Sequence, residues 1–367
     1  MRVLFTGGGT GGHLYPALAI ARALVRVRPD VRPHFVGATR GIERVILPDT
    51  GFPYTLLDLH PLYRSAPWNN WRTARGLLQG WHRLSALARE DAPRLVVATG
   101  GYAASGALAF AAWNRIPFVV QEQNSFPGKT VALFARWARE VYLGFPEAGD
   151  RLPPAARVHA IDTGNPIDPP PASPPDPAAQ RRAWGFGDEV RFVVLAFGGS
   201  QGSAALNALV DGWLSLGLPS GVGLIWGTGR DHYARHEARA GGRVVVRPYL
   251  SPITDAYACA DLAIARAGAM TTAELCAWGI PMFLVPLPTA AADHQTANAR
   301  ALAEAGAARW MAQRDATPGE LARVVREAAS DDALRARWSQ AARARGRPDA
   351  AARIAGRLAA LLPPARA

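Results

Sequence analysis

A glycine-rich loop near the start of the chain constrains the fold more than any other stretch. The loop, Gly7-Gly8-Gly9-Thr10-Gly11-Gly12-His13, joins a short apolar run, Arg2 to Phe5, to a helix-like run, Pro16 to Val27. A strand that turns through glycines into a helix surrounds an open cradle with unpaired backbone N–H groups and the positive end of the helix dipole. Such a cradle suits an anion or a crowded polar ligand. Its last residue is His13, and because an imidazole is the side chain best suited to exchange a proton near neutral pH, His13 is the best candidate for a catalytic base.

Apolar runs and helix-like runs alternate along both halves of the chain. Strands that are separated by helices pair in parallel through right-handed crossovers, and ligands of such sheets sit beyond the carboxyl ends of the strands. The sequence therefore predicts two doubly wound α/β sheets. The predicted strands are Arg2 to Phe5, Arg32 to Val36, Arg94 to Ala98, Phe118 to Gln121 and Val141 to Leu143 in the first half, and Arg191 to Ala196, Gly223 to Trp226, Arg243 to Val246, Leu262 to Ala265 and Met282 to Val285 in the second.

A proline-rich run, Asn165 to Pro177, separates the two halves. This density of proline excludes a helix or a central strand and is typical of a stiff, extended linker. We therefore predict an N-terminal domain over residues 1–164, a C-terminal domain over residues 165–348 and a C-terminal helix over about residues 349–367. Two such domains would face each other across a cleft lined by strand-end loops.

Composition narrows the class of protein. With 49% hydrophobic and 19% charged residues the chain is globular, and it has neither a membrane-spanning apolar run nor a signal-peptide layout. The net charge of +12 admits nucleic acid, anionic lipid or a polyanionic substrate as a partner, although arginines scattered through Ala/Arg-rich helices account for much of it. The two cysteines, Cys259 and Cys276, lack metal-site or redox spacing, so no metal is expected.

The glycine loops indicate which chemistry to expect. Gly7, Gly9 and Gly12 satisfy the dinucleotide fingerprint. That fingerprint also needs an acidic residue at the end of the second strand to hold a ribose, and none is present there through Thr39. A nicotinamide or flavin enzyme is therefore disfavoured. The second half contains two similar turns, Gly198 to Ser203 and Gly268 to Thr271. Two cradles at neighbouring strand ends fit a pyrophosphate. Glu274, one turn into the following helix, is well placed to accept two ribose hydroxyls.

Seven motifs, taken together, resemble the MurG family, whose members are UDP-N-acetylglucosamine:N-acetylmuramyl-(pentapeptide) pyrophosphoryl-undecaprenol N-acetylglucosamine transferases. The resemblance extends from residue 1 to about residue 310 in the right order. The motifs are Gly8-Gly9-Thr10-Gly11-Gly12-His13 with Pro16-Ala17-Leu18-Ala19, Gly100-Gly101-Tyr102, Glu122-Gln123-Asn124, Gly164-Asn165-Pro166, Gly198-Gly199-Ser200-Gln201-Gly202 with Asn207, Arg266-Ala267-Gly268-Ala269 with Glu274, and Asp293-His294-Gln295 with Asn298.

The resemblance implies a GT-B fold and an inverting transfer of N-acetylglucosamine from UDP-N-acetylglucosamine to the lipid-linked acceptor, lipid I, which gives lipid II. It also implies that the C-terminal helix packs back on the first domain. His13 would act as the base, with Glu122 as its rival, and Tyr102 and Gln121 would lie on the acceptor side. The implied donor contacts are Thr10, Gly11, Gly12, Asn124, Ser200, Leu250, Ala269, Met270, Thr271, Glu274 and Gln295.

Two positions depart from the family pattern. Gln121 stands where the family usually has histidine, and Asp168 stands near the place where an arginine often follows Asn-Pro. The amide of Gln121 does not exchange a proton near neutral pH, as a histidine would. Asp168 leaves the donor phosphates without the expected arginine, and Arg266 is the candidate to replace that cation. The chain has no Asp-x-Asp pair, so backbone dipoles and side-chain donors would stabilise the pyrophosphate without a cofactor, and turnover is expected to survive EDTA.

One stretch has the content of a helix that lies on a membrane surface. Trp68, Trp71, Leu77, Leu78, Trp81 and Leu84 alternate with Arg64, Arg72, Arg75 and Arg83. Aromatic and leucine side chains suit the headgroup boundary, and arginines suit anionic lipid. The alternative is an ordinary amphipathic helix that packs on the core. The first interpretation places the protein at the cytoplasmic face of the membrane, as a peripheral protein.

Three other functions remain open from the sequence. A second GT-B glycosyltransferase acting on a glycolipid would share the donor side, and a UDP-sugar epimerase would share the two-domain scaffold. A nucleic-acid-binding protein would explain the charge but not the glycine loops, and no nucleic-acid motif is present, so no nucleic-acid partner is expected.

Overall fold

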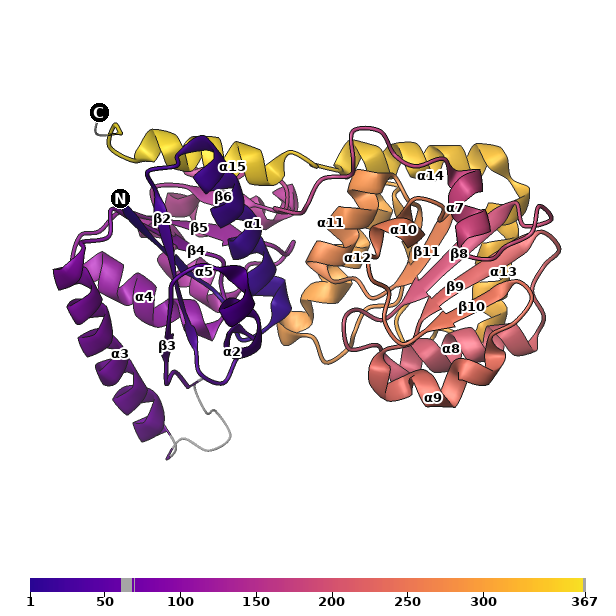
Figure 1. The fold of residues 1–367 in the computed structure, drawn as a ribbon, viewed down its shortest axis with the longest axis horizontal. Coiled ribbons are helices and arrows are strands. Elements are labelled where there is room, and N and C mark those ends of the chain that lie inside the picture. The colour runs from indigo at the N-terminus through magenta and orange to yellow at the C-terminus, as the bar shows by residue number, and fades with distance from the viewer. Residues whose placement is uncertain (61–67, 69, 366–367) are drawn as a thin grey trace. The chain divides into compact units, whose positions relative to one another are not determined.

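The computed structural model describes residues 1–60, 68 and 70–365, and Arg64 lies outside these residues. The chain divides into two compact units: Met1–Asp168 together with Asp349–Ala367, and Pro169–Pro348 (Figure 1). Each unit contains one parallel sheet flanked by helices, which confirms the predicted α/β class.

The first unit contains a seven-stranded sheet within the described residues, in the order β3-β2-β1-β4-β5-β6-β7. Every neighbouring pair is parallel, so the strands all end at the same edge. The strands are β1 (Arg2–Thr6), β2 (Arg32–Ala38), β3 (Tyr54–Leu57), β4 (Leu95–Ala98), β5 (Phe118–Glu122), β6 (Val141–Leu143) and β7 (Ala160–Asp162). The helices are α1 (Gly11–Val27), α2 (Glu43–Ile46), α3 (Asn70–Glu90), α4 (Tyr102–Trp113), α5 (Lys129–Phe134), α6 (Pro154–Arg157) and α15 (Ala350–Leu361), with short 3₁₀ turns η1 (Leu47–Thr50), η3 (Ala135–Trp137) and η4 (Pro146–Arg151).

The second unit contains a six-stranded sheet within the described residues, in the order β10-β9-β8-β11-β12-β13, again parallel throughout. The strands are β8 (Phe192–Phe197), β9 (Val222–Gly227), β10 (Val244–Arg247), β11 (Leu262–Ala265), β12 (Met282–Leu284) and β13 (Ala308–Trp310). The helices are α7 (Pro177–Ala183), α8 (Ala204–Ser215), α9 (Tyr233–His236), α10 (Thr254–Tyr257), α11 (Ala269–Trp278), α12 (His294–Glu304), α13 (Pro318–Ser330) and α14 (Asp332–Arg345), with 3₁₀ turns η5 (Arg230–His232), η6 (Glu237–Arg239) and η7 (Ala291–Asp293).

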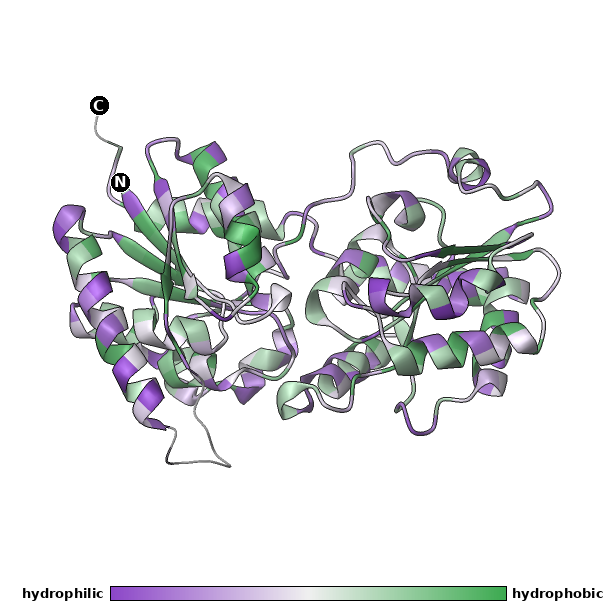
Figure 2. Ribbon diagram, turned by 60° about the horizontal axis from the view of Figure 1, so that its bottom comes forward, coloured by the Kyte–Doolittle hydropathy of each residue, from purple (hydrophilic) through white to green (hydrophobic). Residues whose placement is uncertain are grey.

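Helices cover both faces of the first sheet, so its central strands are apolar on both sides (Figure 2). Val3 and Phe5 of β1 pack toward α1 and α15, whereas Leu4 packs on the opposite face with residues of α3, α4 and α5. This alternation within one strand follows from the two-residue period of β structure. The carboxyl ends of the strands remain free to carry the loops of the site.

Helix α1 begins at Gly11, earlier than the predicted start at Pro16. Proline inside a helix removes one backbone hydrogen bond, and for that reason the sequence favoured a start at the proline. The structure instead places Pro16 inside the helix. His13 therefore belongs to the first helical turn and not to the loop before it.

The last helix, α15, packs alongside α1 in the first unit (Figure 1). Ile354, Ala355 and Leu358 of α15 have no exposed surface and belong to the same apolar cluster as Phe5 and Leu18. Arg357 forms an ion pair with Glu140 at 2.6 Å. Helix α15 therefore completes the apolar core that β1 and α1 form in the first unit.

Candidate active site

The edge of the first sheet holds His13 between three loops. Thr99 Oγ1, at the end of β4, donates a hydrogen bond of 2.7 Å to the backbone oxygen of His13. The imidazole lies against Gly100 and Gly101, because a Cβ added there would come within 3.3 Å of Nδ1 and 3.1 Å of Cδ2 respectively. Both glycines also have positive φ angles, 94° and 77°. The Gly-Gly pair is therefore required both for its backbone conformation and for the space that the ring occupies.

The glycine loop is occupied by the carboxyl group of Glu43. This carboxylate has no exposed surface, and its Oε1 accepts hydrogen bonds from Gly9 N at 3.0 Å and Ala38 N at 3.1 Å. A Cβ at Gly8 would lie 1.8 Å from Oε1, and one at Gly41 would lie 1.9 Å from Oε2. Glu43 thus fills the position that a bound phosphate would take in this loop, and its carboxylate is not available to a ribose. The sequence argument against a nicotinamide or flavin enzyme was wrong in its premise, because an acidic residue does follow the second strand, but this carboxylate is buried and hydrogen-bonded within the loop.

We expect Glu43→Ala to lower the free energy of unfolding of the first unit by about 1–3 kcal/mol, because it leaves the N–H groups of Gly9 and Ala38 without an acceptor. Glu43→Gln keeps an acceptor oxygen and should lower the free energy of unfolding by less. Urea unfolding of the full chain, followed by tryptophan fluorescence, measures both. A Glu43→Ala protein as stable as the unsubstituted one would show that this carboxylate does not hold the loop.

The predicted rival base, Glu122, is committed to its own loop. Its side chain is buried, Oε1 accepts from Asn124 N at 2.9 Å and from Asn124 Nδ2 at 3.1 Å, and Oε2 accepts from Gly128 N at 2.7 Å. Both carboxylate oxygens therefore fix the path of residues 122–128. The geometry favours His13 over Glu122 as the group that is available to a substrate.

The other predicted residues of the first unit lie at the same edge of the sheet, with different exposure. Thr10, the N-cap of α1, and Gly12, in its first turn, are exposed, and Gly11 is half-buried. Tyr102 begins α4 and covers Gly9, where a Cβ would lie 2.8 Å from Tyr102 Cε1. Gln121, expected on the acceptor side, has no exposed surface, so we now assign it a role inside the protein.

The second unit has an open cradle at the carboxyl ends of β8 and β11. A pocket of about 510 Å³ is lined by residues of the Gly198–Ser203 loop, the start of α8, Gly268 and Thr271, and Gln295. Thr271 and Gln295 are predicted donor contacts. Ser200, another predicted donor contact, is an exposed residue of the Gly198–Ser203 loop. Gly202 has a φ of 79° and lies so close to Thr228 O that a Cβ would come within 2.2 Å. The tight turn therefore depends on glycine at this position.

The remaining donor candidates surround this pocket without lining it. Ala269 is buried and Met270 half-buried in the first turn of α11, and Leu250 is 7% exposed and packs over Gly227. Glu274 lies one turn further along α11, where its Oε2 accepts a hydrogen bond of 2.8 Å from Tyr257 OH. Burial, and then the Glu274 carboxylate, raise the pKa of Tyr257, so the phenol stays a donor and holds this carboxylate in one orientation.

Arg266 places a buried positive charge beside the same pocket. Its Nε and Nη2 donate to Ser203 Oγ at 3.1 and 2.7 Å, and its other N–H groups reach the backbone oxygens of Val285 and Pro286 and Gln313 Oε1. Among the described residues no carboxylate pairs with it, and burial lowers its pKa. All five N–H groups are engaged, so none is left for a direct hydrogen bond to a ligand, and two of them fix Ser203, the N-cap of α8.

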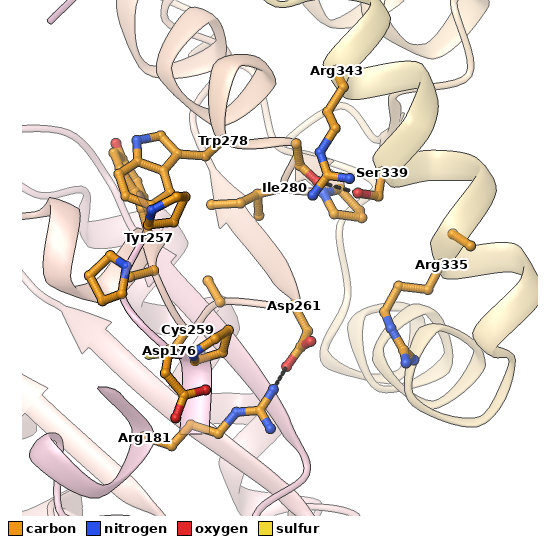
Figure 3. A pocket seen from close by; sticks show the side chains of 18 of the residues that line it. Asp176, Arg181, Tyr257, Cys259, Asp261, Trp278, Ile280, Arg335, Ser339 and Arg343 are labelled. Atoms are coloured by element: carbon orange, nitrogen blue, oxygen red, sulfur yellow. Dashed lines mark hydrogen bonds and ion pairs between the residues drawn. The ribbon is translucent and has the colours of Figure 1, made fainter. Parts of the chain in front are cut away.

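A second cavity of the same unit, about 680 Å³, lies at the opposite ends of the strands (Figure 3). Its lining residues Asp261 and Pro281 come directly before β11 and β12. The charge of Arg181 is already matched there by Asp261 at 2.9 Å. Because ligands of doubly wound sheets sit at the carboxyl ends of the strands, the smaller pocket is the candidate ligand site of this unit.

Sequence reasoning missed Glu43, and it listed Gln123 only as part of a motif. The fingerprint requires an acidic residue close to the end of the second strand. Glu43 lies four residues beyond Thr39, the last residue that the sequence argument considered. Gln123 accepts a hydrogen bond from the His13 ring, since its Oε1 lies 2.8 Å from Nδ1. Nothing local in the sequence connects these two residues, which are 110 positions apart.

Comparisons with known proteins agree with this geometry. The N-terminal domain of glycosyltransferase family 28 matches residues 3–143, and the C-terminal domain of the same family matches residues 193–354. A Salinibacter ruber protein is 40% identical over 98% of this chain and 96% of its own length, and its name is UDP-N-acetylglucosamine--N-acetylmuramyl-(pentapeptide) pyrophosphoryl-undecaprenol N-acetylglucosamine transferase. The crystal structure of Acinetobacter baumannii MurG matches with a TM-score of 0.77 and 27% identity over 98% of this chain and 99% of that one. A UDP-N-acetylglucosamine 2-epimerase shares the fold alone, with a TM-score of 0.65 at 14% identity over 97% of this chain and 94% of that one.

Proposed function

The chain belongs to the MurG family of glycosyltransferases, and from this membership we propose that it transfers N-acetylglucosamine from UDP-N-acetylglucosamine to the C4 hydroxyl of the N-acetylmuramyl group of lipid I. The product is lipid II, the precursor of peptidoglycan. The observation that carries the proposal is that one unit has an open pocket at the Gly198–Ser203 loop and the other has a histidine, His13, held by a hydrogen bond to Gln123.

We assign the nucleotide to the second unit. The N-termini of α8 and α11 and the buried charge of Arg266 supply fixed positive potential for the diphosphate, and Glu274 supplies acceptors for the ribose. Ser200, Leu250, Ala269, Met270, Thr271 and Gln295 stay as proposed donor contacts, together with Thr10, Gly11, Gly12 and Asn124. The first unit is a poor alternative, because Glu43 already fills its glycine loop.

The reaction inverts the anomeric carbon. The acceptor oxygen attacks the anomeric carbon from the face opposite to UDP, and its proton passes to His13 Nε2. The bond between the anomeric carbon and the phosphate oxygen breaks, and its electrons leave with UDP. A positioned base contributes about 10²- to 10⁴-fold, and fixed donors stabilise the charge that develops on the leaving group. The helix N-termini and Arg266 already provide this stabilisation, so we propose that no cofactor is needed.

The direct test incubates the protein with labelled UDP-N-acetylglucosamine and a short-chain lipid I analogue. We expect a labelled disaccharide product by mass spectrometry, at a rate that EDTA does not change. Epimerised sugar without transfer would instead identify an epimerase. A crystal structure with uridine diphosphate bound far from Ser200 and Glu274 would contradict the donor assignment.

We further propose that α3 binds an anionic membrane surface, which would place the protein at the cytoplasmic face as a peripheral protein. The inward face of α3 is largely small, since Gly76 lies against Asp58 O and Gly80 against Leu57, with Leu84 as its one fully buried large side chain among the described residues. Two large apolar side chains of α3 lie outside, Trp71 at 56% and Leu78 at 66% exposed, and Trp68, just before the helix, is 74% exposed. An ordinary core-packing helix shows the reverse distribution. None of the described helices is long and apolar enough to cross a bilayer.

Trp81, the fourth predicted membrane contact, is half-buried. Its ring packs edge-on against Phe110, with centroids 5.1 Å apart, and against Trp113, which is 78% exposed. Trp81 therefore joins the exposed surface of α3 to the core of the unit.

Replacing Trp68, Trp71 and Leu78 together by alanine should abolish binding to vesicles of anionic phospholipid at low salt, because it removes the apolar side chains that would enter the headgroup boundary. Binding of the unsubstituted protein should weaken as salt rises. Vesicle co-sedimentation measures both effects. Leu216→Ala, at a leucine of the second unit that is 62% exposed, is the matched control and should still bind. Failure of the unsubstituted protein to bind at low salt would defeat the membrane assignment.

A further inference from the structure

We propose that Gln123 is a positioning residue that fixes the tautomer of His13, with the proton on Nδ1 and the lone pair on Nε2. The consequence for catalysis rests on the proposed transfer, but the tautomer is a property of the free protein. Its test is therefore independent of any substrate.

The contact that decides the tautomer is buried. Gln123 is 2% exposed, and its Oε1 lies 2.8 Å from His13 Nδ1. A carboxamide presents an oxygen that only accepts and a nitrogen that only donates. If the oxygen faces the ring, Nδ1 must carry a proton. If the nitrogen faces the ring, Nδ1 must be bare.

Two backbone oxygens determine which end of the amide faces the ring. Gln123 Nε2 donates to Thr99 O at 2.8 Å and to Gln121 O at 3.2 Å. Backbone oxygens only accept, so turning the amide over would set its oxygen against both of them. The flip would lose two buried hydrogen bonds and leave three oxygens facing one another. The oxygen therefore faces His13, and Nδ1 is the donor.

A second layer of amides holds this orientation. Gln121 Oε1 is a third acceptor beside Gln123 Nε2, whose two N–H groups are shared among the three oxygens. Gln121 Nε2 donates to Asn165 Oδ1 at 3.1 Å, and Asn165 Nδ2 donates to the backbone oxygen of Gln123 at 2.9 Å. All three side chains are at most 2% exposed. Each amide places its nitrogen on an acceptor whose position the next amide fixes. This closed set, which we call the amide relay, explains why Gln121 and Asn165 are buried polar residues.

The amide relay does not change its protonation in the physiological range, so it keeps the same direction at every working pH. The ionisable groups on the elements packed around His13 are Glu43, Glu122 and Tyr102, and none of them bonds the imidazole. His13 Nε2 has no hydrogen-bond partner in the part of the chain that the structure describes. The nitrogen that the amide relay leaves unprotonated is thus the one that remains free for an acceptor hydroxyl.

The test is a long-range ¹H–¹⁵N NMR correlation on the full chain labelled with ¹⁵N-histidine, with the His13 signals identified by their loss in His13→Gln. At a pH where the ring is neutral, we expect Nδ1 to give the protonated shift and Nε2 the unprotonated shift. The reverse assignment in the unsubstituted protein would overturn the proposal.

Gln123→Leu supplies the second measurement. It should return His13 to a mixture of tautomers and lower kcat by about 10²-fold, the lower end of what a general base contributes, while KM for UDP-N-acetylglucosamine stays within about twofold. Gln340→Leu, at an exposed glutamine of α14, is the matched control. A folded Gln123→Leu protein with an unchanged tautomer would also overturn the proposal. If the tautomer is as expected but no disaccharide forms, the proposed function fails and the positioning role stands.

Discussion

His13→Ala is expected to lower kcat by about 10²- to 10⁴-fold, because it removes the proposed base. KM for UDP-N-acetylglucosamine should change little, since the proposed donor pocket lies in the other unit. The side chain is partly exposed and packs on glycines and Gln123, so its loss should not unfold the protein. Single-turnover and steady-state rates at saturating substrates measure the effect.

Two variants make the result specific. His159→Ala replaces an exposed histidine of the same unit and should retain full activity. Glu122→Gln keeps one acceptor oxygen for its loop and should retain far more turnover than His13→Ala. Near-normal turnover of His13→Ala would exclude histidine as the base, and an equal loss in Glu122→Gln would move the proton transfer to Glu122.

The sequence predicts the central strands well, because both of their faces are buried. Runs such as Phe192–Phe197 and Leu95–Ala98 are apolar throughout, as strands buried on both faces must be. The strands β3, β7 and β13 lie at the edges of their sheets and were not predicted. β7, Ala160–Asp162, has only half-buried residues and no apolar run. A strand that the sheet pairs on one side, with little burial, carries too little hydrophobic signal to be found from its sequence.

The candidate site divides in the same way. The glycine loops and His13 could be predicted, because a strand that turns through glycines into a helix has a local signature. The partner of His13 could not, because the contact from Gln123 joins the end of one strand to the start of a distant helix. Glu43 was missed for a related reason, since its function depends on the hydrogen bond to Gly9, 34 residues away. Local patterns indicated the candidate residues, and only the tertiary structure identified the residues that hold them in place.

The packing of α15 on α1 makes the first unit depend on the last residues of the chain. Ile354 and Leu358 are fully buried against the cluster that contains Phe5 and Leu18, on the face of the sheet that lies behind the His13 loop. Burying a side chain of this size contributes about 1.5–3 kcal/mol. The ion pair between Arg357 and Glu140 contributes far less, since Arg357 is 46% exposed.

Leu358→Ala is therefore expected to lower the free energy of unfolding of the first unit by about 2–5 kcal/mol, a large share of the stability of a typical domain. Urea unfolding of the full chain measures this change, and Leu216→Ala, at an exposed leucine of the second unit, is the matched control. A Leu358→Ala protein that unfolds at the same urea concentration as the unsubstituted one would mean that α15 does not support the core.

Arg357→Ala separates the ionic contribution from the apolar one through its pH dependence. Burial would raise the pKa of Glu140, but hydrogen bonds from Arg357 and Tyr142 bring it below its ordinary value of 4.5. A carboxyl whose pKa is lower in the folded state stabilises the fold above its unfolded pKa and loses that contribution as the pH falls through the folded pKa. The cost of Arg357→Ala, at most about 1 kcal/mol, should thus be present at pH 7 and vanish in acid, whereas the cost of Leu358→Ala should persist at both. An equal pH dependence for the two variants would mean that charge, and not apolar burial, fastens α15 to the core.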